Sequence, residues 1–469
     1  MRPRVDLERV YRATPVWAQD ALASLHGWRL QRERFGNGYA EVERHVIERR
    51  SLSGSALVEF QARRLTAHLQ AAQATAFWRV RFAEHGVNPA GSDPFIELHK
   101  LPVLTKAEVR AHASEIRSSA YEPGELITGH TSGTTGAGLV LWETRAAIRE
   151  RWAVWWRYRR WFGLDPAMRS GHFGGRSVVP ITQSRPPYWR RNHPGRQLLL
   201  SAYHLNAQTV EAYWRALREW DAEWLHGYPS FLALFADLCR LRNLPRIDSV
   251  RVVTVGAENL LANQRRSIES VFGVPVRQHY GLAEGVANVS EHPDGRLRVD
   301  EDYALTEFVP ANDSASSAHR ILGTNWSNPA FPLFRYDTGD VATLPNPVPV
   351  PTDVWREVTT IDGREEDYVL LPDGSRVGRL DHVFKDLVHI REAQIYQPAA
   401  DLLVLRIVKG PAYDEHHEEE RLLLEMRQRV GSALPIRIEY LDDIPRSRRG
   451  KLRFVVSELT EARLQPSSS

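Results

Sequence analysis

The spacing of apolar residues predicts that the N-terminal part of the chain is mostly helical. Residues 6–25, 40–49 and 56–85 mix apolar positions at helical spacing with arginine and glutamate. Thr105 and Glu108 are spaced as a capping box, in which each side chain binds the backbone N–H of the other residue. We therefore expect helices as far as Ile116.

A different pattern begins beyond that point. The apolar runs 126–127 and 139–142 predict two strands, and a helix rich in arginine and tryptophan is expected after them. Trp152, Trp155 and Trp156 share one face of that helix. Such a stripe can floor a ligand pocket, but aromatic stripes more often belong to the core, and we expect core here.

Alternating helical and strand patterns then indicate α/β layers. Residues 178–201 are predicted to be irregular. Helices and strands alternate after them in the segments 210–220, 231–241, 250–255, 263–272 and 274–278. Beyond a proline-rich connector at 345–351, strand patterns at 402–408 and 436–440 flank a helix, which predicts a small α+β domain.

Composition narrows the class of protein. A length of 469 residues predicts two or three domains, and a net charge of only +3 argues against a dedicated nucleic-acid binder. No apolar run suits a signal peptide or a membrane span, so a cytoplasmic protein is expected. Cys239 is the only cysteine, which excludes an intramolecular disulfide and a cysteine-ligated zinc site. Its apolar helical neighbours predict a core position.

The loop between the first two predicted strands carries candidate phosphate-binding chemistry. It consists of Thr131, Ser132, Gly133, Thr134, Thr135 and Gly136. Glycines let a ligand approach the main chain, hydroxyls can donate to phosphate oxygens, and successive N–H groups can form an anion-binding nest. The alternative is an ordinary hairpin turn. No Gly-Lys-Ser/Thr sequence closes the loop, so it is not a Walker loop.

Five further stretches follow this loop in a fixed order. They are Gly256-Ala257-Glu258, Tyr280-Gly281-Leu282-Ala283-Glu284, residues 336–340, Gly363-Arg364 and residues 445–451. Together the six stretches resemble the motifs of the adenylate-forming enzymes, the superfamily of acyl-CoA synthetases and peptide-synthetase adenylation domains. The resemblance covers nearly the whole chain. Within the superfamily it favours phenylacetate–CoA ligase-like proteins, in particular the branch often found with capsular-polysaccharide genes.

The resemblance implies both an architecture and a reaction. The expected fold is α/β, with a large N-terminal domain of stacked sheets and flanking helices at 1–362 and a small mobile α+β domain at 363–469. The implied reaction joins a small carboxylic acid to ATP with Mg²⁺, releasing pyrophosphate, and then transfers the acyl group. The acceptor would be CoA, a carrier protein or a small nucleophile, and neither nucleic acid nor a membrane span is expected.

The resemblance also implies a role for each motif residue. The hydroxyl-rich loop, including Thr135, would hold the phosphates, and Gly256, Ala257 and Glu258 would border the nucleotide. Tyr280 would stack on adenine, Gly281 would let the base approach the backbone, and Glu284 would bind Mg²⁺. Asp340 would accept from the ribose hydroxyls, with Arg364 reaching the ribose or phosphate. Lys451 would bridge the carboxylate and the α-phosphate as a flexible point charge.

Plainer alternatives stay open for several of these residues. Tyr280 and Glu284 could form a strand-end turn, Asp340 could be a turn residue, and Lys451 could be one cation of an exposed basic run. His130 and His279 each precede a motif, so either could orient substrate or be a hydrogen-bonded structural histidine.

The chain departs from the family pattern in two places. Ala137 and Gly138 stand after the phosphate loop, where the family often has a lysine. Residues 367–374 replace the usual glycine-rich thioester-forming loop, which puts CoA in doubt as the acceptor. Two other functions stay open. One is phosphotransfer, and the other is single-stranded nucleic-acid binding by the arginine and aromatic residues of 185–196.

Overall fold

The computed structural model describes residues 11, 14–130, 139–174, 178–180, 183–201, 204–257, 260, 262–310, 318–345, 355–362, 369–372, 376–377, 380, 383, 390–409, 413–431, 434–442, 444 and 455–459. Two compact units divide the chain. One consists of Met1–Gly129 with Leu141–Arg364, and the other of His130–Val140 with Glu365–Ser469.

The first unit begins with helices, as the apolar spacing predicts. They are α2 (Val16–Phe35), α3 (Tyr39–Glu48), η1 (Arg49–Ser51), α4 (Gly54–Ala72), α5 (Ala76–Glu84), α6 (Pro94–His99), α7 (Lys106–Ala111), α8 (Ala113–Ile116) and η2 (Pro123–Glu125). The pattern at 56–85 is split between α4 and α5, because the Thr75 hydroxyl accepts from the Trp78 N–H and starts a new helix. The capping box of Thr105 and Glu108 is confirmed.

One large sheet forms the centre of this unit. Its strands are β3 (Ser170–Gly174), β4 (Trp189–Asn192), β5 (Gln197–Ser201), β6 (Trp224–Gly227), β7 (Val252–Gly256), β8 (Val276–Gly281), β9 (Asn288–Glu291), β10 (Leu297–Val299) and β14 (Glu357–Val358). Their order is β14-β10-β9-β8-β7-β6-β3-β5-β4. Neighbours from β5 to β8 run parallel, so their carboxyl ends share one edge.

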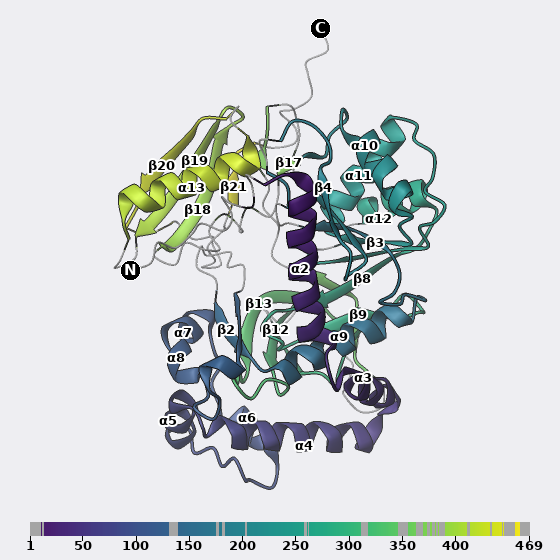
Figure 1. Ribbon diagram of the computed structural model, residues 1–469. Helices are drawn as coiled ribbons and strands as arrows, with labels where there is room; N and C mark the ends of the chain where they lie inside the picture. The colour runs from purple at the N-terminus through teal and green to yellow at the C-terminus, as the bar shows by residue number, and fades with distance from the viewer. Residues whose placement is uncertain are drawn as a thin grey trace. The chain divides into compact units, whose positions relative to one another are not determined.

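The two faces of this sheet differ in chemistry. Phe173, Leu200, Leu225, Val253 and Val276 point to one face and form a core with α10 (Val210–Trp220), α11 (Pro229–Leu241) and α12 (Ala262–Phe272), which lie together beside the sheet in Figure 1. Cys239 belongs to this core, as predicted. The opposite face carries polar side chains and packs against α9 (Arg145–Arg160), where Trp156 meets Trp224 at 6.3 Å between ring centroids.

The prediction that residues 178–201 are irregular is wrong at 189–192 and 197–201, because β4 and β5 extend the sheet there. Arg190 conceals the strand pattern, since its charged side chain is fully buried. It donates to Gln19 and to the carbonyls of Pro187 and Trp189. Tyr188 is buried as well. Two of the residues proposed for nucleic-acid binding are therefore internal.

A second sheet of the first unit is antiparallel. It has the order β11-β12-β13-β15, from β11 (Leu305–Pro310), β12 (Ala318–Thr324), β13 (Tyr336–Thr343) and β15 (Thr360–Asp362). The predicted strands on either side of the hydroxyl-rich loop are β1 (Ile127–His130) and β2 (Val140–Glu143), which pair with each other.

The second unit has its own sheet and core. The sheet order is β20-β19-β18-β21, from β18 (Ile390–Ala399), β19 (Leu402–Lys409), β20 (Ile436–Tyr440) and β21 (Val455–Ser457), and β16 (Val369–Leu370) pairs with β17 (Arg376–Val377). Helix α13 (Glu415–Val430) lies along this sheet in Figure 1 and buries Leu422 and Met426 against Ile395 and Leu405. The two predicted strands and the helix between them are confirmed, and so is the α/β class. Within the described residues, no helix is both long and apolar enough to cross a membrane.

Candidate nucleotide-binding site

Two of the predicted site residues, Tyr280 and Asp340, are in direct contact. The Tyr280 hydroxyl donates a hydrogen bond of 2.8 Å to Oδ2 of Asp340. Burial raises the pKa of the Tyr280 hydroxyl, and the charge of Asp340 raises it further, so tyrosine remains the donor at neutral pH. Asp340 is itself buried, at 8% exposure. The contact places an aromatic ring beside an acceptor-only carboxylate.

A bulge in β13 positions Asp340. The pairing of β12 with β13 shifts register between Arg320 and Leu322. Gly339 has a φ of 76°, a backbone conformation that favours glycine. The Thr338 hydroxyl accepts from the Asp340 N–H over 3.1 Å. Bulges re-aim side chains, and here the strand resumes with Asp340 directed at Tyr280.

The third predicted residue, Glu284, lies on the turn that follows β8. Its carboxylate accepts a long hydrogen bond, 3.4 Å, from the Tyr336 hydroxyl, and its carbonyl accepts from Asn325 over 3.1 Å. Arg151 of α9 donates to the neighbouring carbonyl of Ala283 over 3.1 Å. The charge of Glu284 contributes to the raised pKa of Tyr280. Glu284, Tyr280 and Asp340 are therefore neighbours, and the Glu284 carboxylate is only partly buried.

The backbone beside Tyr280 is tightly constrained. Gly256 lies opposite His279 at the end of β7, and Ala257 after it has a φ of 67°. A left-handed alanine costs about 1–2 kcal/mol, and such strain is concentrated at ligand sites. A Cβ on Gly281 would lie 2.7 Å from Oδ1 of Asn288, so glycine is needed here for packing alone.

The remaining predicted residues lie outside the described part of the chain. They are Thr131, Ser132, Gly133, Thr134, Thr135, Gly136, Glu258, Arg364 and Lys451. The side chain of His130 is also outside it. The site that the structure describes is thus the edge formed by the carboxyl ends of β7 and β8 together with Asp340 of β13. Ligands of open α/β sheets bind at this kind of edge.

His279 is held as a structural histidine would be. Its Nε2 lies 2.9 Å from Oδ1 of Asn288, and its ring stacks on Tyr158 at 5.6 Å between centroids. Burial lowers the pKa of His279 to about 4, so the ring is neutral at physiological pH. It nevertheless keeps some accessible surface next to Tyr280.

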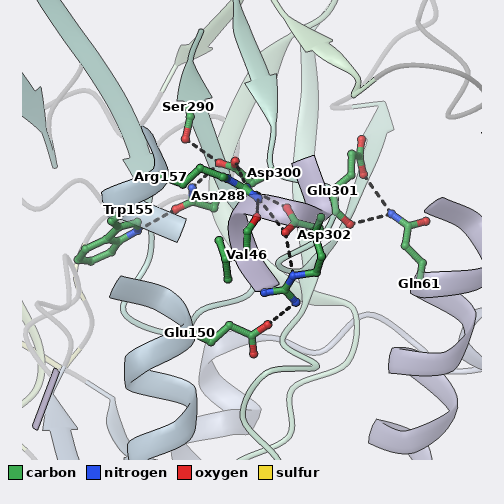
Figure 2. Close-up of polar contacts among 11 residues, drawn as sticks. Val46, Gln61, Glu150, Trp155, Arg157, Asn288, Ser290, Asp300, Glu301 and Asp302 are labelled. Atoms are coloured by element: carbon green, nitrogen blue, oxygen red, sulfur yellow. Dashed lines mark hydrogen bonds and ion pairs between the residues drawn. The ribbon is translucent and has the colours of Figure 1, made fainter. Parts of the chain in front are cut away.

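Behind the site lies a buried polar network, shown in Figure 2. Asn288 of β9 accepts from Trp155 Nε1 over 3.0 Å and donates to Asp300 over 2.6 Å, and Ser290 donates to the same Asp300 oxygen over 2.7 Å. Since Asn288 also contacts His279, the network connects α9 to the strand that carries Tyr280.

Arg157 occupies the centre of this network. Its guanidinium donates to both oxygens of Asp302 over 2.9 Å, to Asp300 over 2.8 Å and to the Val46 carbonyl over 2.8 Å. Burial opposes the charge of Arg157, but the two carboxylates outweigh it and raise the pKa of Arg157. α9 is thereby held against the sheet below the site.

Sequence reasoning missed Arg157, Asn288, Asp300 and Asp302. Asp300 and Asp302 belong to a run of three consecutive acids directly after β10, which is the one signal in the sequence that could have drawn attention to them. Arg157, however, is one of several arginines in its helix, and no pattern distinguishes it. The expectation that Trp156 is core is confirmed, while Trp152 and Trp155 are only partly buried.

The sequence of the chain is similar to those of several known proteins. Residues 369–458 match the family described as the CapK C-terminal domain. The chain is 23% identical to protein CapK of Staphylococcus aureus over 97% of this chain and 100% of that protein. It is 24% identical to the phenylacetate–coenzyme A ligase of Thermus thermophilus over 86% of this chain and 96% of that protein.

A solved structure supports the fold. The thioesterification state of 2-hydroxyisobutyryl-CoA ligase, in complex with 2-HIB-AMP and CoA, matches with a TM-score of 0.53 and 17% identity, covering 91% of each chain. The postadenylation state of the same ligase, with 2-HIB-AMP, matches with a TM-score of 0.51 and covers 85% of this chain and 89% of that one. The chain therefore has the fold of the adenylate-forming enzymes and is similar to CapK and to the phenylacetate–coenzyme A ligases, as its motifs predict.

Proposed function

We propose that the chain activates a carboxylic acid with ATP and then transfers the acyl group to a nucleophile. The observation that carries this proposal is the contact between Tyr280 and Asp340. It joins two motifs at one sheet edge and supplies an aromatic face beside a carboxylate, which suits a nucleoside. The relatives whose names describe ligases support the same chemistry.

The described residues fit ATP and a magnesium ion. The Tyr280 ring would stack on adenine, and the Asp340 carboxylate would accept from the ribose hydroxyls. Glu284 offers a hard oxygen ligand that is partly accessible. When bound, Mg²⁺ supplies charge neutralisation at the phosphates. Glu284 would hold the ion, and Tyr336 and Asn325 would fix the orientation of Glu284.

Two chemical steps follow from this assignment. A carboxylate oxygen of the acid attacks the α-phosphorus of ATP, the bond from that phosphorus to the bridging oxygen breaks, and pyrophosphate leaves. A nucleophile then attacks the acyl carbon, and AMP leaves with the electron pair of the acyl–oxygen bond. Both steps depend mainly on positioning and on stabilising negative charge.

The residues outside the described part of the chain complete the proposal. The loop from Thr131 to Gly136 would hold the phosphates, Arg364 would reach the ribose or phosphate, and Lys451 would bridge the two reacting groups in the first step. We propose a large domain at 1–362 that binds ATP and the acid, and a mobile small domain at 363–469 that carries Lys451.

The acceptor is the finer part of the proposal. CoA is supported by the relatives described as coenzyme A ligases. Residues 367–374 lack the glycine-rich pattern expected for thioester formation, which favours testing amine and hydroxyl acceptors beside CoA.

The decisive experiment measures the products of ATP turnover with a panel of aryl, acyl, amino and sugar acids. Pyrophosphate and AMP, with hydroxamate when hydroxylamine is supplied, are expected for at least one acid. Production of ADP would indicate phosphotransfer instead. Salt-dependent oligonucleotide binding with no turnover would favour a nucleic-acid-binding protein.

A further inference from the structure

Arg159 is a buried arginine that forms no ion pair with any residue the structure describes. It is 7% exposed, and its Nε is buried with no hydrogen-bond partner. Among the described residues, the carboxylates near α9 pair with other arginines: Asp300 and Asp302 with Arg157, Glu43 and Asp165 with Arg160. None of them pairs with Arg159. Burial lowers the pKa of Arg159 to about 10, so it is still charged at neutral pH.

Aromatic rings surround this guanidinium. Its central carbon lies 5.1 Å from the ring centre of Trp156, 5.6 Å from Trp224 and 5.7 Å from Trp152. Each ring attracts a desolvated cation by about 2 kcal/mol. Desolvating a charge costs several kcal/mol per ion, and the three rings offset part of that cost without accepting a hydrogen bond from the guanidinium in its plane. A buried arginine with this cost needs another reason to be present.

Three histidines lie near Arg159. Trp224, over which the guanidinium lies, is 5.4 Å from His172 and 5.8 Å from His226 between ring centroids. The charge of Arg159 is one cause of the lowered pKa of these two histidines and of His279. His172 of β3 and His226 of β6 are paired across the sheet, with ring centres 5.2 Å apart. His279 extends this polar face on β8. Burial is the main cause in each case and lowers the pKa of His172 to about 3. The rings are therefore neutral donors and acceptors and do not add to the positive charge.

The three histidines are only partly buried. Each keeps some accessible surface, although burial is the main cause of its lowered pKa. Neighbours fix the orientation of two of the rings: Nδ1 of His226 lies 2.9 Å from the Thr254 hydroxyl, and Nε2 of His172 lies 3.2 Å from Gln197. His172 is the middle residue of β3, His226 is the last but one of β6, and His279 directly precedes Tyr280 on β8.

We propose that this cluster of Arg159, tryptophans and histidines binds a second anionic group on the acid substrate, with Arg159 as its counter-charge. The substrate would then be a dianion, whose one carboxylate reacts and whose other group, a carboxylate or a phosphate, pairs with Arg159. A planar guanidinium pairs bidentately with either group. The neutral imidazoles would donate further hydrogen bonds, and the tryptophan rings would contact the part of the acid between its two charges. This inference rests on the function proposed above.

The test pairs dianionic acids with their neutralised counterparts. Pyrophosphate release is measured with malonate, succinate, glutarate, adipate and phosphoglycerate. The same measurement is made with the monoamides of the dicarboxylates. We expect at least one dianion to exceed its neutralised partner in kcat/KM. Arg159→Met should lower that value about 10- to 100-fold, as for loss of a hydrogen bond to a charged group, and leave the monoamide unchanged. Arg159→Lys should retain part of the preference.

Two matched measurements separate selectivity from structure. Arg160→Met, one position further along α9 and paired with Glu43 and Asp165 on the surface, should leave the preference unchanged. Arg159→Met should melt at the same temperature as the wild type or higher, because it removes an uncompensated buried charge. A fall in melting temperature as large as that caused by Arg157→Met would show that Arg159 mainly stabilises the fold, and it would overturn the proposal.

Binding without turnover distinguishes this inference from the proposed function. Tryptophan fluorescence should respond to titration with the same dianions in the absence of ATP, and Arg159→Met should abolish the response. If no acid releases pyrophosphate but this binding is seen, adenylation fails and the anion site stands. If acids are adenylated with no preference for dianions, and Arg159→Met changes nothing, the anion site fails and adenylation stands.

Discussion

The Tyr280 hydroxyl and the Asp340 carboxylate are 2.8 Å apart, although the two residues are separated by 60 positions in the chain. The contact connects β8 of the large sheet to β13 of the antiparallel sheet. A nucleoside placed against the Tyr280 ring would therefore meet the carboxylate at a fixed position. This preorganisation is the basis for the first prediction.

Asp340→Ala should raise the KM for ATP and have much less effect on the KM for the acid. The lost hydrogen bonds to the ribose involve a charged acceptor, which corresponds to roughly 1.5–3 kcal/mol, or about 10- to 150-fold. Tyr280→Phe keeps the ring and should have a smaller effect. Asp294→Ala, which removes a surface pair with Arg298, serves as the control. A change confined to the KM of the acid would show that the nucleotide is placed wrongly.

Glu284→Gln should weaken the response to Mg²⁺ while leaving the fold intact. Glutamine keeps the shape of the side chain but loses the charge that makes it a good magnesium ligand. Pyrophosphate release measured against Mg²⁺ concentration should show a higher half-saturation point, and the melting temperature should stay unchanged. Wild-type activity at limiting Mg²⁺ would remove Glu284 from the site.

Lys451→Ala should slow adenylation about 100- to 1000-fold, the usual effect of losing one preorganised contact to developing charge. Lys451 lies outside the described residues, so this prediction rests on the motif at 445–451. ATP binding should barely change, and transfer from a supplied acyl-adenylate should survive. Arg448→Ala and Arg449→Ala are the matched controls. Equal effects in all three variants would make Lys451 an ordinary surface charge.

Local pattern was enough to predict most elements of the fold, whereas Tyr280, Glu284 and Asp340 were predicted to act together only through the resemblance of their motifs to a known family. Hydrophobic spacing reports which side of a helix or strand is buried, and it succeeds where buried residues are apolar. It failed at β4, because the strand turns the charged Arg190 inward. It failed for the same reason at Arg157 and Arg159, whose burial depends on strands far away in the sequence. Partners such as Asp300 and Asp302 become visible only when the sheet is assembled.

Arg157→Met should destabilise the first unit by about 3–5 kcal/mol, because it leaves the buried Asp300 carboxylate without a cation and Asp302 with only its 3.4 Å contact to Arg49. Chemical denaturation gives the free energy of unfolding directly. Combining the substitution with Asp300→Asn and Asp302→Asn should recover part of the loss, since the residues are coupled. Arg160→Met, in exposed ion pairs, should cost no more than about 1 kcal/mol. A small loss for Arg157→Met would mean that water reaches the network.

The free energy of unfolding should fall as the pH is lowered from about 6.5 towards 4, and the buried histidines are one cause of this fall. The pKa of His172 is lowered to about 3 and that of His279 to about 4, mainly by burial. The unfolded chain takes up a proton at each histidine near pH 6.5, whereas the folded chain does not, so acid favours unfolding. Each histidine contributes up to about 1.4 kcal/mol per pH unit in this window.

His172→Gln should reduce the slope of the unfolding free energy against pH by about one proton, whereas His85→Gln, at an exposed position, should leave it unchanged. If the two variants gave the same slope as the wild type, His172 would take up its proton in the folded protein as it does in the unfolded chain, and would add to the positive charge of Arg159 and Arg34, which both act on it.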